Sequence, residues 1–121
     1  MGSRPAAGAG EGLGYLAPMS PLSRAELEAL VAEAVVDAYG DDEQLTGLYT
    51  MIADNLAVPF TTQVLGVEVT VRRVDLRPGG IVAVCQRGRI RQAIGILDLP
   101  LPDPPPEGAQ WIEAYRYWAG G

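Results

Sequence analysis

The sequence predicts a single α+β domain, in which helices from both ends of the chain pack on a small antiparallel β-sheet. Apolar side chains recur at helical spacing in residues 24–56, alternate with polar ones from residue 67, and return to helical spacing in residues 110–118. With 121 residues, the chain has room for one hydrophobic core rather than two. We therefore expect one domain over residues 23–121, preceded by a disordered tail over residues 1–22 that is rich in Gly, Ala and Pro.

The first expected helix begins at a capping box. Ser23 and Glu26 stand three residues apart, as the N-cap and N3 residues of such a box do. One helix face then carries an apolar stripe made of Leu27, Leu30, Val31, Ala34, Val35 and Ala38. We expect this helix to cover residues 24–38 and to end at Gly40, in the C′ role that favours glycine.

A second helix is expected to follow at once. Asp41 or Asp42 can cap its start, because short carboxylates accept hydrogen bonds from the free N–H groups of a first turn. Its apolar stripe is made of Leu45, Leu48, Tyr49, Ile52 and Leu56. Pro59 has no N–H and cannot continue a helix, so we expect this helix to cover residues 43–55.

The middle of the chain reads as strands. Valines alternate with polar residues from residue 67, which predicts a half-buried strand over residues 67–76. Glycine-containing turns then separate further strands over residues 81–86 and 90–97, and an earlier strand is possible around residues 61–65. Such an antiparallel meander predicts a small curled sheet or an SH3-like β-barrel.

Five prolines between residues 100 and 106 predict an extended crossing before the last helix. Residues 110–118 again show helical spacing, with Trp111, Ile112, Tyr115 and Trp118 apolar. We expect this C-terminal helix to dock on the core.

The absence of two residue types excludes several kinds of site. The chain has no histidine and no lysine, and all nine basic residues are arginine. The commonest general base, the imidazole metal ligand and the Schiff-base amine are therefore missing. Cys85 is the only cysteine, which excludes an internal disulfide and predicts a buried, inert thiol. We expect a protein that is not an enzyme.

Hydropathy and charge suggest where the protein works. No apolar run approaches the roughly 18 residues that span a bilayer, and the first 22 residues lack a signal-peptide stretch, so we expect a cytoplasmic protein with no membrane partner. Residues 23–57 hold one arginine against eight acids, whereas residues 61–98 hold six arginines against three acids. The net charge of −6 disfavours nucleic acid as a partner.

A family resemblance rests on short segments spread along the chain. They are Val36-Asp37-Ala38-Tyr39-Gly40, Glu43-Gln44, Gly47, Tyr49, Asp54, Leu56, Pro59-Phe60 and Ala114-Tyr115-Arg116-Tyr117-Trp118. In this order and spacing, the chain resembles the small bacterial calcium-binding protein family first described in cyanobacteria. The resemblance implies helices packed on an SH3-like barrel, with Ca²⁺ held by acidic side chains.

The residues themselves favour the junction of the first two helices as the calcium site. Asp37 lies at the expected C-terminal end of the first helix and four residues after Glu33, and both neighbours disfavour its negative charge. A divalent cation would reverse that penalty, with Asp41 and Glu43 arriving just beyond the turn. The metal-ligand candidates are Asp37, Asp41, Asp42, Glu43, Asp54 and Glu113.

Three alternatives accompany this hypothesis. Asp41 and Asp42 can serve only to cap the second helix, with the other acids forming a solvated face. The chain can be a protein-interaction module that has lost its metal, whose polarised surface orients a protein partner. The arginines of the hairpin around Gly88 can touch phosphates, although pairing with the acidic helices or simple solvation is the plainer interpretation.

Overall fold

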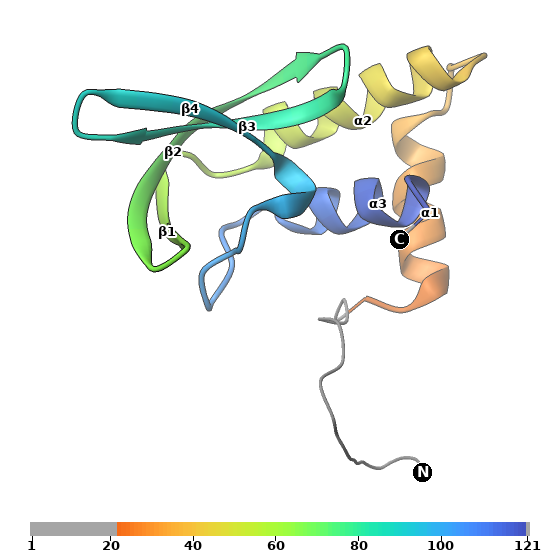
Figure 1. The fold of residues 1–121 in the computed structure, drawn as a ribbon. Coiled ribbons are helices and arrows are strands. Elements are labelled where there is room, and N and C mark those ends of the chain that lie inside the picture. The colour runs from red at the N-terminus through yellow and green to blue at the C-terminus, as the bar shows by residue number, and fades with distance from the viewer. Residues whose placement is uncertain (1–21, 121) are drawn as a thin grey trace, which may run out of the picture.

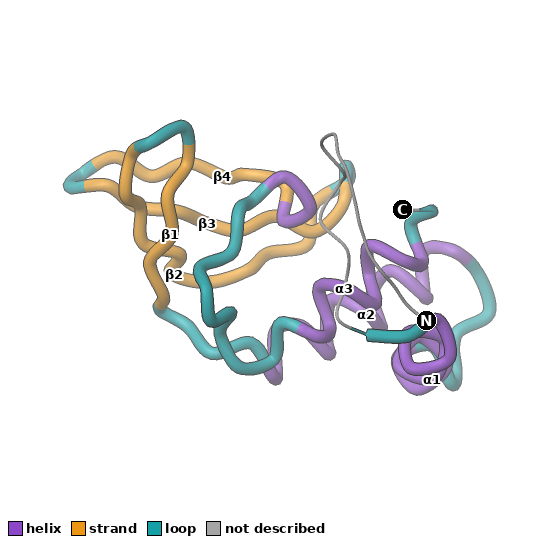
Figure 2. The backbone as a smooth tube through the Cα atoms, turned by 90° about the horizontal axis from the view of Figure 1, so that it is seen from below, coloured by secondary structure: helices purple, strands orange, loops and turns teal. Residues whose placement is uncertain are grey.

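The computed structural model describes residues 22–120, which form three α-helices and one four-stranded antiparallel sheet (Figure 1). In chain order these are α1 (Arg24–Ala34), α2 (Asp41–Asn55), β1 (Phe60–Val64), β2 (Val67–Arg77), β3 (Gly80–Arg87), β4 (Ile90–Gly95), a 3₁₀ turn (Ile96–Asp98) and α3 (Gln110–Trp118). The helices gather at one end of the molecule and the sheet at the other (Figures 1 and 2). The predicted α+β class is confirmed, and the predicted tail lies outside the described residues except for Leu22.

The start of α1 is the predicted capping box, but its end differs from the prediction. The Glu26 amide donates to Ser23 Oγ at 3.1 Å, and the Ser23 amide donates to Glu26 Oε1 at 2.8 Å. The helix ends at Ala34, about one turn before the predicted end, and Val35 leaves the helical region with φ −109° and ψ 18°.

Gly40 does not end α1. It has φ −152°, which is extended backbone, and it is the N-cap residue of α2. A close helix crossing explains the early end of α1, because the backbone of Gly47 on α2 lies directly against the carbonyl of Ala34. Because α2 crosses α1 at Ala34, the chain leaves the helical path directly after this residue and connects to the start of α2.

The four strands are paired in the order β1-β2-β3-β4. A register shift between Val71 and Arg73 leaves Arg72 as an extra residue on β2. The predicted SH3-like barrel is not confirmed, because within residues 22–120 the sheet is open and β1 does not pair with β4. The segment after the 3₁₀ turn passes β1 instead, where the buried Thr62 donates from Oγ1 to the Pro100 carbonyl at 2.6 Å.

The hydrophobic core lies between the helices and the concave side of the sheet. Its largest cluster joins Leu48 and Ile52 of α2, Ile81 of β3, and Trp111 and Ile112 of α3. A smaller cluster joins Val71 of β2 and Ala83 and Cys85 of β3 with Leu99, which follows the 3₁₀ turn. As predicted, α3 covers residues 110–118 and docks on the core, and the thiol of Cys85 is buried. In the described part of the chain, no helix combines the length and apolarity needed to cross a membrane.

Candidate functional site

Four acidic residues surround the connection between α1 and α2. Asp37 lies in the turn that follows α1, and Asp41, Asp42 and Glu43 form the first turn of α2. All four are exposed, so their side chains are free to change rotamer. We refer to residues 33–43, which also include Glu33, as the acidic junction.

One hydrogen bond fixes the entry into α2. The backbone amide of Tyr39 donates to Glu43 Oε1 at 2.9 Å, which holds the Glu43 carboxylate against the connecting loop. The apolar pattern did not predict this contact, because Gly40 was expected at the end of the first helix. The spacing of Gly40 and Glu43 was the available signal, since a glutamate at N3 commonly reaches back to the backbone at the helix start.

The electrostatics of the acidic junction are unbalanced. The segment holds five acids and no arginine. Asp41, Asp42 and Glu43 gain some compensation from the positive end of the α2 dipole, an effect worth about 0.3–1 kcal/mol per charge. Asp37 has no such compensation, since it follows the negative end of α1.

The capping alternative for Asp41 and Asp42 is not what the structure shows. The N-cap residue is Gly40, and no side chain hydrogen-bonds to the cap of α2. Neither Asp41 nor Asp42 makes a side-chain hydrogen bond or ion pair within the described chain. Their carboxylate oxygens are therefore available to a ligand.

The other two predicted ligands lie apart from these four. Asp54 is exposed near the end of α2, 11 residues beyond Glu43, which corresponds to about 16 Å along the helix axis. Glu113 is half-buried on α3 and faces Arg116 of the same helix, with 3.8 Å between Glu113 Oε1 and Arg116 Nε. One ion cannot be shared between Glu43 and Asp54.

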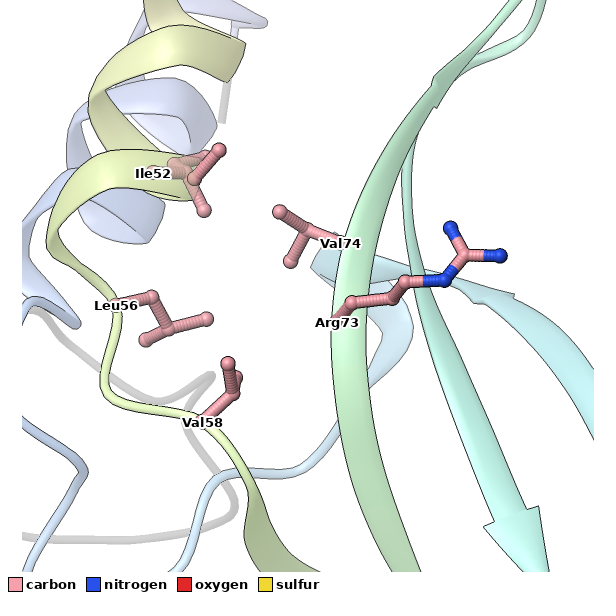
Figure 3. Close-up of a pocket in the computed structure, with 6 residues that line it drawn as sticks. Ile52, Leu56, Val58, Arg73 and Val74 are labelled. Carbon is pink, nitrogen blue, oxygen red and sulfur yellow. The ribbon is translucent and has the colours of Figure 1, made fainter.

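In the side-chain arrangement of residues 22–120, no three acidic or Cys side chains are gathered closely enough to hold a metal ion. The pocket in Figure 3 is not a metal site either. It has a volume of about 110 Å³ and is lined by Ile52, Ala53, Leu56, Val58, Arg73 and Val74, with no carboxylate among them. The guanidinium of Arg73 points away from its apolar wall (Figure 3).

The comparison with protein families supplies the identity of the ligand. A family model described as calcium binding, that of the CcbP proteins, matches residues 28–119. The chain belongs to this calcium-binding family. The match confirms the resemblance noted in the sequence and calcium as the ligand, and it runs from α1 to the end of α3. Among curated proteins and among solved structures, the chain has no significant match.

Membership of the CcbP family agrees with the chemistry of the chain. Calcium prefers hard oxygen donors, and carboxylates and backbone carbonyls are what this histidine-free chain offers. The matched region contains every one of the six predicted ligands.

Proposed function

We propose that this protein is a calcium buffer or sensor that holds its ion at the acidic junction. Asp37, Asp41 and Glu43 act as the principal ligands in this proposal, and Asp42 supplements them. The family match carries the calcium assignment. The location is supported by the local excess of acids, which no arginine of the segment offsets.

The ligand requirement of calcium sets what the junction has to do. Calcium takes six to eight oxygen ligands at about 2.3–2.6 Å. Three or four carboxylates can supply part of this shell, and loop carbonyls and water supply the rest. Because the carboxylates are exposed and not yet gathered, they converge by rotamer changes when the ion binds.

Calcium binding at this position relieves unfavourable charge interactions of the apo protein. The ion neutralises Asp37 at the negative end of α1 and removes the repulsion among neighbouring carboxylates. The hydrogen bond from Tyr39 to Glu43 keeps one ligand in place beforehand. Because the remaining ligands are exposed and must be ordered, we expect a dissociation constant in the micromolar to millimolar range, about 10⁻⁶–10⁻³ M.

The proposed role is binding, not catalysis, in the cytoplasm. The missing histidine and lysine support binding over catalysis, because the commonest general base and the Schiff-base amine are absent. A buffer changes free calcium without a partner, whereas a sensor changes shape or surface charge when calcium binds.

Calorimetric titration of the apo protein with CaCl₂ tests the proposal. The wild type should bind saturably, and the double variant Asp37→Asn with Asp41→Asn should bind at least about tenfold more weakly, a loss of about 1.4 kcal/mol. Asp54→Asn is the matched control. It removes one exposed acid from α2, the helix that begins at Asp41, but outside the acidic junction. An unchanged affinity in the double variant would contradict the location, and the absence of any calcium-dependent heat or thermal shift would favour the metal-free interaction module.

A further inference from the structure

The arginines of the sheet divide into two groups. Arg73 and Arg77 both face Asp75, at 3.6 Å and 3.3 Å from its Oδ2. The side chains of Arg72, Arg87, Arg89 and Arg91 make neither a hydrogen bond nor an ion pair within residues 22–120. The acidic helices of the same molecule therefore do not neutralise them.

Three of these free guanidiniums share one projecting structure. The β3–β4 hairpin pairs Arg87 with Ile90 and Gln86 with Arg91, and every residue from 87 to 93 is exposed. Ile90 is 67% exposed, although its register places it on the inner side of the sheet with Cys85 and Ala83 on the strand opposite. The tip thus reaches beyond the core, and we call residues 87–91 the basic arm.

The acidic junction presents the complementary surface. Beside its carboxylates, Val36 is 75% exposed and Tyr39 is 93% exposed. The basic arm and the acidic junction lie at opposite ends of the molecule in both views (Figures 1 and 2). Each end thus combines unpaired charge of one sign with a large exposed apolar side chain, and the two signs are opposite.

We propose that the acidic junction of one copy docks on the basic arm of a second copy, in a head-to-tail contact. Tyr39 and Val36 pack against Ile90, and the carboxylates of Asp41 and Asp42 face the arginines of the arm. The arm and the junction are different patches at opposite ends of the molecule, so each contact is heterologous, and repeated head-to-tail contacts build short chains that keep one arm and one junction free.

Screening decides whether the net charge of −6 prevents this contact. The 15-residue helix α2 alone spans about 22 Å between the junction and the sheet. At about 0.1 M salt the Debye length is about 10 Å, so the local charges at the contact outweigh those at the far ends of both molecules. The interface is small and polar, and the association is accordingly weak and sensitive to salt.

Calcium should oppose this association, an extension that rests on the proposed calcium site. An ion held by Asp37, Asp41 and Glu43 cancels the charge that the basic arm recognises. The protein would then be more associated at low calcium and monomeric at high calcium.

Sedimentation velocity in EDTA, over a range of protein concentrations, tests the contact with two variants. The arm variant carries Arg87→Ser, Arg89→Ser and Arg91→Ser, and the junction variant carries Tyr39→Ser, Asp41→Asn and Asp42→Asn. Each alone should lose at least about tenfold in association constant, because one half of the contact is missing. An equimolar mixture should recover a heterodimer of wild-type affinity that does not grow further, since each variant retains the half that the other lacks.

Arg73→Ser with Arg77→Ser is the matched control, because it removes two sheet arginines that are already paired with Asp75. This control should associate like the wild type. A wild type that stays monomeric at every concentration, or a mixture that fails to recover association, would overturn the proposal. Binding of a labelled DNA single strand by the arm without self-association would likewise overturn it, in favour of a nucleic-acid surface.

Repeating the sedimentation experiment with added CaCl₂ separates the two proposals. Dissociation on adding CaCl₂ supports both the contact and the calcium position. Association that is unchanged by calcium, with the variants behaving as above, supports the contact and contradicts calcium at the junction.

Discussion

Replacing Gly108 by alanine should destabilise the protein more than any other glycine substitution outside the helices. Gly108 has φ +91°, in the left-handed region that residues with a Cβ rarely adopt. A Cβ at this position would also collide with the backbone carbonyl of Asn55 at the end of α2. This close approach lets the amide of Ala57 donate to the Glu107 carbonyl at 2.8 Å. It thereby fixes the start of α3 against the end of α2.

The two costs can be added. Left-handed backbone costs a residue with a Cβ about 1–2 kcal/mol. Overpacking costs about 1–3 kcal/mol more, and relief is limited here because the contacted atoms belong to the backbone. The expected loss of about 2–5 kcal/mol in the free energy of unfolding is a large part of the roughly 5–15 kcal/mol of a typical domain. It corresponds to a fall of roughly 10–30 °C in Tm for a domain of this size.

Urea unfolding of three variants separates these contributions. Gly79→Ala should change stability little, since its backbone is not left-handed and a Cβ there meets open space. Gly66→Ala, with φ +79° and no atom within 4 Å of the added Cβ, should show the backbone cost alone. A loss in Gly108→Ala no larger than that in Gly66→Ala would refute the close contact between Gly108 and the end of α2.

Three further predictions concern stability and titration. Ser23→Ala removes one half of the capping box and should lower the free energy of unfolding by about 1 kcal/mol in urea; no change would show that the box contributes nothing. Ile112→Ala truncates a fully buried side chain and should cost about 2–5 kcal/mol by the same assay, and a loss below that range would mean that α3 packs loosely. The hydroxyl of Tyr117 donates to the Glu28 carboxylate at 2.8 Å, and this hydrogen bond raises the pKa of Tyr117. The contribution of this hydrogen bond to stability is therefore present below the ordinary tyrosine pKa of about 10 and is lost as pH rises through the raised pKa. In an absorbance titration, the component that Tyr117→Phe removes should have its midpoint above about 10. A midpoint at or below that value would contradict the hydrogen bond.

Local patterns predicted most of the fold. The helix over residues 110–118 and the capping box at Ser23 have the predicted positions because their signals lie within one or two turns of chain. The end of α1 was not predictable in this way. Apolar spacing continues through Val35 and Ala38, but the helix stops at Ala34, where the contact with Gly47 of α2 determines the path of the chain.

Closure of the sheet depends on long-range contacts. Alternating valines predict strands, and glycine turns predict their antiparallel order, but neither determines whether the first and last strands meet. Here the chain leaves the sheet at Gly95, and the proline-containing segment after it approaches β1 through a single side-chain hydrogen bond to the Pro100 carbonyl. Proline has no N–H to donate, which makes this segment a poor substitute for a strand.

The candidate site was predictable only in part. Charge and spacing place Asp41, Asp42 and Glu43 at the start of a helix, and the structure agrees. The hydrogen bond between Tyr39 and Glu43 depends on where the first helix ends, so it followed from the structure alone. The proposed convergence of these carboxylates on an ion follows from neither the sequence nor the structure, because no three acidic side chains are gathered within residues 22–120.

The position of the bound ion can be measured directly by ¹⁵N–¹H NMR during a calcium titration of the apo protein. If calcium binds at the acidic junction, the largest saturable shifts will fall on the amides of residues 36–44, with Glu43 and Tyr39 prominent because their hydrogen bond adjusts to the ion. The amides of β3 and β4 will move little, and Asp37→Asn with Asp41→Asn will abolish the pattern. Saturable shifts centred on Asp54, on Glu113 or on the proline-containing segment, with residues 36–44 unmoved, would contradict the account.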